Sequence, residues 1–195
     1  MGKTLTRPSG PEAGGEIGKR RAGFSMVELM VTLCVLSVGM LAFARASVQS
    51  TRAIDASARK AIALSAARGK IEELKGLPFA QVFARYNDTG ADDPGGADTA
   101  PGAFFDVDGL EAATDDADGF VGGIEFPVVD GAPGALREDL ALPEFGLPAD
   151  LSGDLLITSA DHAADYRLLP IIVRLAWRGS SGIERIELRT SLGGL

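Results

Sequence analysis

Residues 24–44 read FSMVELMVTLCVLSVGMLAFA, twenty-one positions that hold a single ionisable group, Glu28. At about 1.5 Å of rise per residue, a helix over this stretch would be about 31 Å long, which is enough to cross the hydrocarbon core of a bilayer. Lys19, Arg20 and Arg21 precede it, and basic flanks stay on the cytoplasmic side. The sequence therefore predicts a transmembrane helix at 24–44 whose following chain is exported.

Two other interpretations of residues 24–44 stay open. A buried core helix is disfavoured by the length of the apolar run. A cleaved secretory signal is the stronger alternative, because Ala42, Phe43 and Ala44 resemble its cleavage site. Against it, the apolar run is longer than the usual run of about 7–15 residues and carries a carboxylate near its start. A mature N-terminus just after Ala44 would remove the membrane segment altogether.

Glu28 needs an explanation, because an ionised carboxylate in hydrocarbon costs about 2.5–3.5 kcal/mol on insertion scales. It lies four residues after Phe24, which is one helical turn. Cleavage between Gly23 and Phe24 would place a positive α-amino group near Glu28, on the same chain or on a neighbouring parallel helix. Leaving one partner of a buried ion pair unpaired is costly. Pairing of the Phe24 amine with Glu28 therefore favours one position of neighbouring helices along their axes. Alternatively, Glu28 lies at the shallow end of the helix and snorkels or is protonated.

The residues Gly23, Phe24, Ser25 and Glu28, between basic residues and a long apolar run, resemble the prepilin signature of type IV pilins and type II secretion pseudopilins. The resemblance implies that a prepilin peptidase cuts after Gly23 and methylates Phe24, and that Glu28 guides assembly. It also implies an inner-membrane protein with its C-terminal head exported, which then joins a surface pilus or a periplasmic pseudopilus. Residues 1–23 are then a cleaved leader, whose composition predicts disorder.

Residues 45–77 are predicted to continue the helix in amphipathic form. They are rich in helix-forming residues, and Gly76 and Pro78 predict the end of the helix. Apolar residues fall at three- and four-residue spacing: Ile54, Ala58, Ala61, Ile62, Leu64, Ile71 and Leu74. The whole helix resembles the spine of a pilin. Its tail, Ala61 to Leu77, resembles PilV-type minor pilins, and the lack of proline from Phe24 to Leu77 favours a minor over a major subunit.

Charge is distributed unevenly along the chain. The net charge is −8, yet residues 86–166 hold nineteen Asp and Glu against the single cation Arg137. Arg45, Arg52 and Arg59 recur every seven residues and form a basic edge on the helix. A solvated face is the usual meaning of such an edge. The alternative is contact with residues 86–166, within the chain or on the next subunit.

Several functional classes are disfavoured by composition. The acidic balance argues against a nucleic-acid partner. Cys34 and His162 are the only residues of their types, so a disulfide within the chain and a Cys/His zinc site are excluded. His162 has no nucleophile motif beside it and is predicted to be exposed. The sequence therefore predicts a structural protein and no enzyme.

The exported head, residues 78–195, is predicted to contain an antiparallel sheet. Residues 124–129 are a candidate edge strand, because Pro127 interrupts them. Residues 169–192 alternate between apolar and polar positions around the turn at 179–182, which predicts a hairpin. A sheet packed on the amphipathic half of the helix gives a pilin-like α+β fold: a long N-terminal spine helix on a small antiparallel head with an acidic Gly/Asp-rich loop region.

Two degenerate matches to a calcium-binding loop lie in the acidic region, at residues 114–125 and 150–161. Their acidic positions are Asp116, Asp118 and Glu125 in the first and Asp150, Asp154 and Asp161 in the second. The first loop lacks aspartate at its first position, and the second lacks the turn glycine. Solvated turns are therefore favoured over calcium sites, and no cofactor is expected.

The sequence favours a minor pilin-like subunit of a type IV pilus, processed by prepilin peptidase. Its expected partners are membrane lipid before assembly and other pilins through the N-terminal helix. A pseudopilin of a type II secretion system is the first alternative. The second is a membrane-anchored or secreted acidic domain that binds calcium and does not polymerise. In that case, Glu28→Ala would be harmless.

Overall fold

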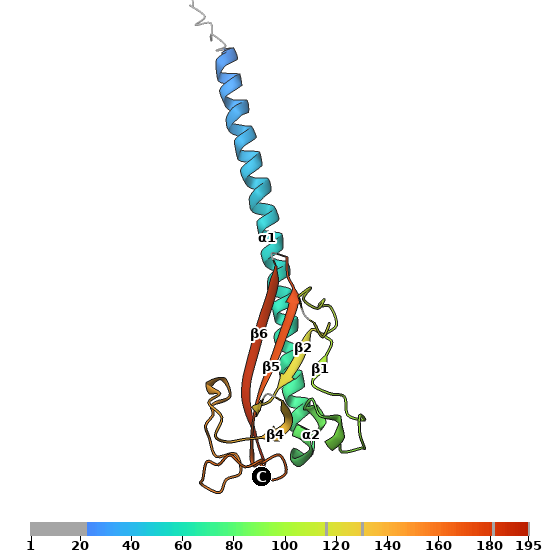
Figure 1. Cartoon of the computed structure of the whole chain (residues 1–195). Coiled ribbons are helices and arrows are strands. Elements are labelled where there is room, and N and C mark those ends of the chain that lie inside the picture. The colour runs from blue at the N-terminus through green and yellow to red at the C-terminus, as the bar shows by residue number, and fades with distance from the viewer. Residues whose placement is uncertain (1–22, 116, 130, 181, 195) are drawn as a thin grey trace, which may run out of the picture. The chain divides into compact units, whose positions relative to one another are not determined.

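The computed structural model describes residues 23–115, 117–129, 131–180 and 182–194. The chain forms two compact units, of which the first ends at Ser47 and the second runs from Val48 to Leu195. The first unit contains the N-terminal half of the long helix. The second contains the rest of that helix and the head (Figure 1).

Helix α1 spans Met26–Lys75, fifty residues. This confirms the predicted spine helix. It ends where Gly76 donates its backbone N–H to the carbonyls of Glu72 and Glu73, both at 3.1 Å. Pro78 follows and cannot continue the helical hydrogen bonding.

The buried face of α1 differs from the predicted apolar stripe. Ile71 and Leu74 are buried as predicted, but Ile54 is 65% exposed. The buried stripe continues instead through Ala63 and Ala67, whose small side chains allow the sheet to lie close to the helix. Ala58, Ala61 and Ile62 of the predicted stripe are exposed, because the sheet packs on the neighbouring face that carries Ala63 and Ala67.

The main sheet is antiparallel and has the order β1-β2-β5-β6. Its strands are β1 (Phe104–Phe105), β2 (Gly122–Glu125), β5 (Leu168–Arg178) and β6 (Ile183–Gly193). The long hairpin of β5 and β6 lies along the C-terminal part of α1 (Figure 1). With α1, this sheet gives the chain the expected pilin-like α+β architecture.

A second, two-stranded sheet pairs β3 (Val128–Val129) with β4 (Ala132–Leu136). The single strand predicted over residues 124–129 is therefore divided between two sheets. Proline lacks the backbone N–H that a continuous ladder needs, and Pro127 lies at the division.

The core forms where α1 meets the sheet. Inward residues of β5 alternate along the strand and pack against Ala67, Ile71 and Leu74: Leu169, Ile171, Val173, Leu175 and Trp177. On β6, Ile186 and Leu188 are partly buried, while Arg185, Glu187 and Arg189 are exposed. On β6 the two-residue period thus separates a core face from a solvent face, whereas on β5 Pro170 and Ile172 of the opposite face are buried as well.

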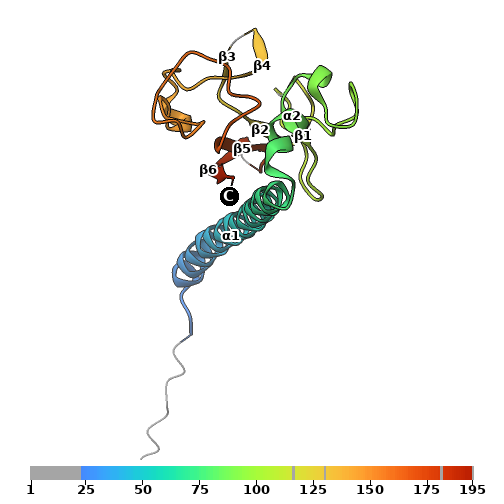
Figure 2. The same cartoon turned by 90° about the horizontal axis from the view of Figure 1, so that it is seen from below.

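Two short helices, η1 (Phe79–Gln81) and α2 (Val82–Tyr86), follow α1. The acidic region after them consists mostly of turns and contains the short helices η2 (Gly90–Asp92) and η3 (Pro143–Phe145). Figures 1 and 2 show the segment around α2 and β1, in green, and the segment after β4, in orange, on either side of the hairpin. The acidic sequence therefore forms two separate loop systems.

Gly122 in β2 should be intolerant of a side chain. A methyl group there would overlap the ring of Phe105, whereas at Gly123 it would lie 3.6 Å from Phe104, an ordinary contact. Gly122→Ala is therefore expected to lower the free energy of unfolding by about 1–3 kcal/mol, as overpacking does. Denaturant unfolding followed by the fluorescence of Trp177 measures it, with Gly123→Ala as the matched control. Equal effects of both substitutions would contradict the packing argument.

Candidate functional site

The bond between Gly23 and Phe24 lies in a short segment before α1. The Phe24 side chain is 80% exposed, and nothing lies within 4 Å of where a Cβ of Gly23 would be. An enzyme can therefore approach this bond without unfolding the helix. The predicted leader, residues 1–22, lies outside the described residues.

Ser25 caps the start of α1. Its carbonyl accepts a hydrogen bond from the N–H of Leu29 at 3.0 Å, and its Oγ accepts one from the N–H of Val27 at 3.4 Å. These bonds satisfy donors that a helix start otherwise leaves free. Serine three residues before glutamate has the spacing of a capping box, a local signal for this helix start that was not among the predictions.

Glu28 lies in the first turn of α1. The N-terminal end of a helix carries partial positive charge, which favours a carboxylate there. Glu28 is thus close in sequence to the position where processing would create a positive amine. The roles of Gly23, Phe24 and Glu28 remain predictions.

The N-terminal half of α1 presents apolar side chains on every side. The most apolar window of the helix has a mean hydropathy of 2.2, and none of it is buried. The exposed large residues here are Met26, Val27, Leu29, Met30, Val31, Leu33, Val35, Leu36, Val38, Met40, Leu41 and Phe43. An apolar surface of this extent needs lipid or other helices to cover it.

The two hydroxyl groups in this stretch are satisfied within the helix. Thr32 Oγ1 donates to the carbonyl of Leu29 at 2.9 Å, and Ser37 Oγ donates to that of Leu33 at 2.7 Å. Such bonds remove the cost of placing a hydroxyl in hydrocarbon. Length, hydropathy and hydrogen bonding are all those of a transmembrane helix.

Comparison with known proteins identifies this segment. Residues 18–44 match a family model described as the prokaryotic N-terminal methylation motif, the signature of type IV pilins and pseudopilins. Searches of curated proteins and of solved structures returned no significant match. The chain thus carries the N-terminal signature of a pilin-class structural subunit.

Its N-terminal residues match a prepilin-type methylation motif, and its N-terminal helix is long and apolar enough to span a membrane. The signature implies processing by prepilin peptidase, anchoring in a membrane with the head exported, and assembly with other pilins.

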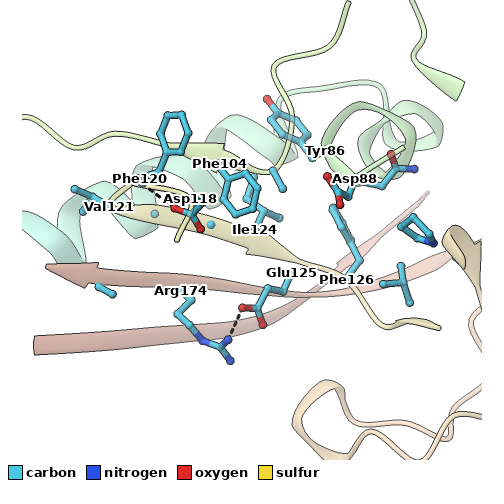
Figure 3. Close-up of a pocket in the computed structure, with 17 residues that line it drawn as sticks. Tyr86, Asp88, Phe104, Asp118, Phe120, Val121, Ile124, Glu125, Phe126 and Arg174 are labelled. Carbon is cyan, nitrogen blue, oxygen red and sulfur yellow. Dashed lines mark hydrogen bonds and ion pairs between the residues drawn. The ribbon is translucent and has the colours of Figure 1, made fainter. Parts of the chain in front are cut away.

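In the first predicted calcium loop, Glu125 lies in β2 and is paired with Arg174 (Figure 3). Asp118 Oδ1 accepts the N–H of Phe120 at 2.8 Å, which closes a turn. Asp116 lies outside the described residues. Glu125, at the twelfth position, is thus already paired with a cation, and calcium binding by this loop stays a prediction.

The second predicted calcium loop is assembled only in part. Asp150, Asp154 and Glu138 form a cluster in which one carboxylate oxygen from each residue lies within 4.8 Å of the others. Among the described residues, this is the one cluster of potential metal ligands. Glu138 was missed because it precedes the loop. Asp161 is used elsewhere, accepting the N–H groups of Leu136 and Ala163. Calcium binding at these residues stays a prediction.

Glu138 is fully buried and holds the loop together. Its Oε1 accepts the N–H groups of Leu151 and Ser152 at 2.7 and 2.8 Å, and its Oε2 accepts that of Thr158 at 3.3 Å. Burial alone would raise the pKa of Glu138, but these donors outweigh burial and hold the pKa below its usual range. The carboxylate is already occupied as a structural acceptor.

His162, which the sequence analysis placed on the surface, is buried beside Glu138. Its Nε2 lies 3.5 Å from Glu138 Oε2 and 3.2 Å from Thr158 Oγ1, and its Nδ1 lies 3.1 Å from Asp165 Oδ1. Local sequence could not show this, because Glu138 is twenty-four positions away. His162 is part of a structural cluster.

Acid should weaken this loop. The pKa of Glu138 is lower in the folded protein than in the unfolded chain, where it is near 4.5. The ionised carboxylate therefore stabilises the folded state fully at pH values above 4.5. This stabilisation is lost as the pH falls through the pKa of the folded state. Between pH 7 and pH 3, thermal unfolding in detergent should therefore show a smaller loss of stability for Glu138→Gln than for the unaltered protein. Parallel pH profiles would contradict this assignment.

The basic edge of α1 does not pair with the acidic region inside the chain. Arg59 Nη1 donates to the backbone carbonyl of Arg178 at 2.8 Å. Among the described residues, no ion pair joins Arg45, Arg52 or Arg59 to residues 86–166. Over the described residues, the basic edge therefore makes no ion pair of the predicted intramolecular kind.

Proposed function

We propose that this protein is a minor pilin of a type IV pilus, made as a prepilin, cut after Gly23 and assembled through residues 24–44. The observation that carries the proposal is Glu28. It is the lone carboxylate of residues 24–44, in the first turn of α1, where the helix is otherwise apolar and uncovered, and it follows closely on an accessible Gly23–Phe24 bond. The methylation motif over residues 18–44 supports the same processing.

In the proposed mechanism, the protein acts by assembly and performs no turnover. Cleavage frees the α-amino group of Phe24, which offsets the negative charge of Glu28 on the same or a neighbouring helix. The apolar side chains from Leu29 to Phe43 then leave their contacts with lipid and pack against the helices of other subunits. A helix shifted along its axis would leave both charges unpaired in hydrocarbon, so the pair sets the register.

Two features favour a minor over a major pilin subunit. No proline interrupts the chain from Phe24 to Leu77, and α1 is continuous from Met26 to Lys75. A pseudopilin of a type II secretion system uses the same assembly physics and is the second candidate. Deleting the gene separates the two: a minor pilin predicts loss of surface pili with secretion intact, and a pseudopilin predicts the opposite.

Mass spectrometry of the protein extracted from membranes tests the processing. The expected N-terminal peptide begins at Phe24 and carries one added methyl group. Recovery of residues 1–23 from cells with an active prepilin peptidase would refute the proposed function. An N-terminus just after Ala44 would instead indicate an ordinary secretory signal.

A further inference from the structure

The head contains a pocket of about 410 Å³ between α2, β1 and β2. Its walls are largely apolar and include Phe104, Phe120, Ile124 and Phe126 (Figure 3). The rings of Phe104 and Phe120 stack with centroids 6.0 Å apart, yet these side chains are 45% and 39% exposed. Exposed stacked aromatic rings beside an apolar hollow are typical of a surface that a partner covers.

The rim of this pocket is acidic. Asp88, Asp118 and Glu125 line it, against the single cation Arg174. Arg174 is already paired with Glu125 and, at 3.0 Å, with Glu187. Within the described residues, Asp88 and Asp118 form no ion pair. The pocket therefore suits a group that joins an apolar side chain to a positive charge.

Such a group is present on α1 of the same chain. Val48, Arg52, Arg59 and Ala63 are spaced by four, seven and four residues, so they share one helix face. The chain's own sheet buries Ala63, and Arg59 reaches the carbonyl of Arg178 at the end of β5. Beyond that point the face is uncovered: Val48 is 52% exposed, and Arg52 is exposed without an ion pair in the described part of the chain.

We propose that the pocket of one copy receives the Val48–Arg52 face of α1 from a second copy. Val48 enters the apolar hollow, and Arg52, one turn away, meets Asp88 and Asp118. The inference rests on the proposed function, because it concerns subunits that assemble side by side. It places the predicted contact between the basic edge and the acidic region between two subunits.

A second exposed apolar feature fits the pocket less well. Leu155, Leu156 and Ile157 form a protruding tip and are 90%, 61% and 52% exposed. Asp154 precedes this tip, so its approach would bring like charges together at the rim. Charge therefore selects the basic helix face as the occupant.

The proposed contact can propagate. The helix face and the pocket share no residues, so each copy can offer one surface and use the other. Heterologous contacts of this kind build open helical assemblies when the rotation does not close. A minor subunit with this contact would enter filaments in short runs of its own copies.

Crosslinking between two differently tagged full-length copies in cell membranes tests this. Both copies carry Cys34→Ala, so that no native cysteine reacts. The first copy also carries Val48→Cys, and the second carries Ala103→Cys. Ala103 lies in the pocket wall, and its replacement leaves the aromatic rings in place. A short bismaleimide is expected to give a dimer with both tags. Arg52→Glu in the first copy should lower its yield about tenfold, because it sets like charges opposite each other.

Charge exchange and a matched control complete the experiment. Asp88→Lys with Asp118→Lys in the second copy should restore the dimer formed by Arg52→Glu. Arg68→Glu, an exposed arginine on another face of α1, should leave the yield unchanged. A dimer indifferent to Arg52→Glu, or lost equally with Arg68→Glu, would overturn the contact.

The same samples separate this inference from the proposed function. N-terminal mass and recovery in sheared pili are measured alongside the crosslink. Processed, incorporated protein that gives no crosslink refutes the inference and leaves the proposed function standing. Protein that keeps residues 1–23 refutes both.

Discussion

Replacing Glu28 with alanine is expected to leave the protein in the membrane and processed, but to lower its incorporation into pili about a hundredfold or more. Removing one partner of a buried ion pair costs about 3–5 kcal/mol, which is more than two powers of ten in an equilibrium. Without Glu28, the amine of Phe24 would remain unpaired among apolar helices. The ratio of protein in sheared pili to protein in membranes, measured by immunoblot, gives the effect.

Thr32→Ala is the matched control for this prediction. Thr32 lies one turn after Glu28, and its hydroxyl bonds only to its own helix in the described structure, at the carbonyl of Leu29. Its loss should leave incorporation nearly unchanged. If Glu28→Ala were incorporated as well as Thr32→Ala, the pairing mechanism would be wrong, and an anchored domain that does not polymerise would be favoured.

Replacing Glu138 with alanine is expected to destabilise the head by about 3–5 kcal/mol. The substitution removes the acceptor of three backbone N–H groups, from Leu151, Ser152 and Thr158, and each donor left unsatisfied in the interior costs about 1–3 kcal/mol. For a domain of this size, such a loss lowers the melting temperature by about 10 °C or more. Trp177, the one tryptophan of the chain, is buried in β5 and reports the transition by fluorescence.

Glu144→Ala controls for the loss of a carboxylate from the same acidic region. Glu144 lies in η3, is partly exposed and forms no ion pair among the described residues. Its replacement should change stability by less than about 0.5 kcal/mol. Similar melting temperatures for Glu138→Ala and Glu144→Ala would show that Glu138 does not organise the loop.

The helix and the main hairpin were predictable because their signals are local and repeated. Residues 24–44 are apolar at nearly every position, and Gly76 with Pro78 stops the helix. In β5 and β6, two-residue alternation on both sides of a glycine-containing turn defines a hairpin without any knowledge of distant contacts. The methylation motif is equally local, since its residues lie at fixed offsets within a short segment.

The acidic region was not predictable in the same way. Carboxylates there have equivalent local surroundings in sequence, and only the fold separates the buried acceptor Glu138 from the exposed Asp154. The same holds for His162, which the chain brings next to Glu138, and for Glu125, which pairs with Arg174 across two strands.

The apolar N-terminal segment, the spine helix and the methylation motif were determined by the sequence alone, because hydropathy and fixed spacing act over a few turns of chain. Tertiary structure alone decided which face of α1 is covered, which carboxylates are used as acceptors, and where the aromatic pocket lies. Those outcomes depend on contacts between residues far apart in sequence, where the choice among similar side chains is made by packing and by the position of backbone donors.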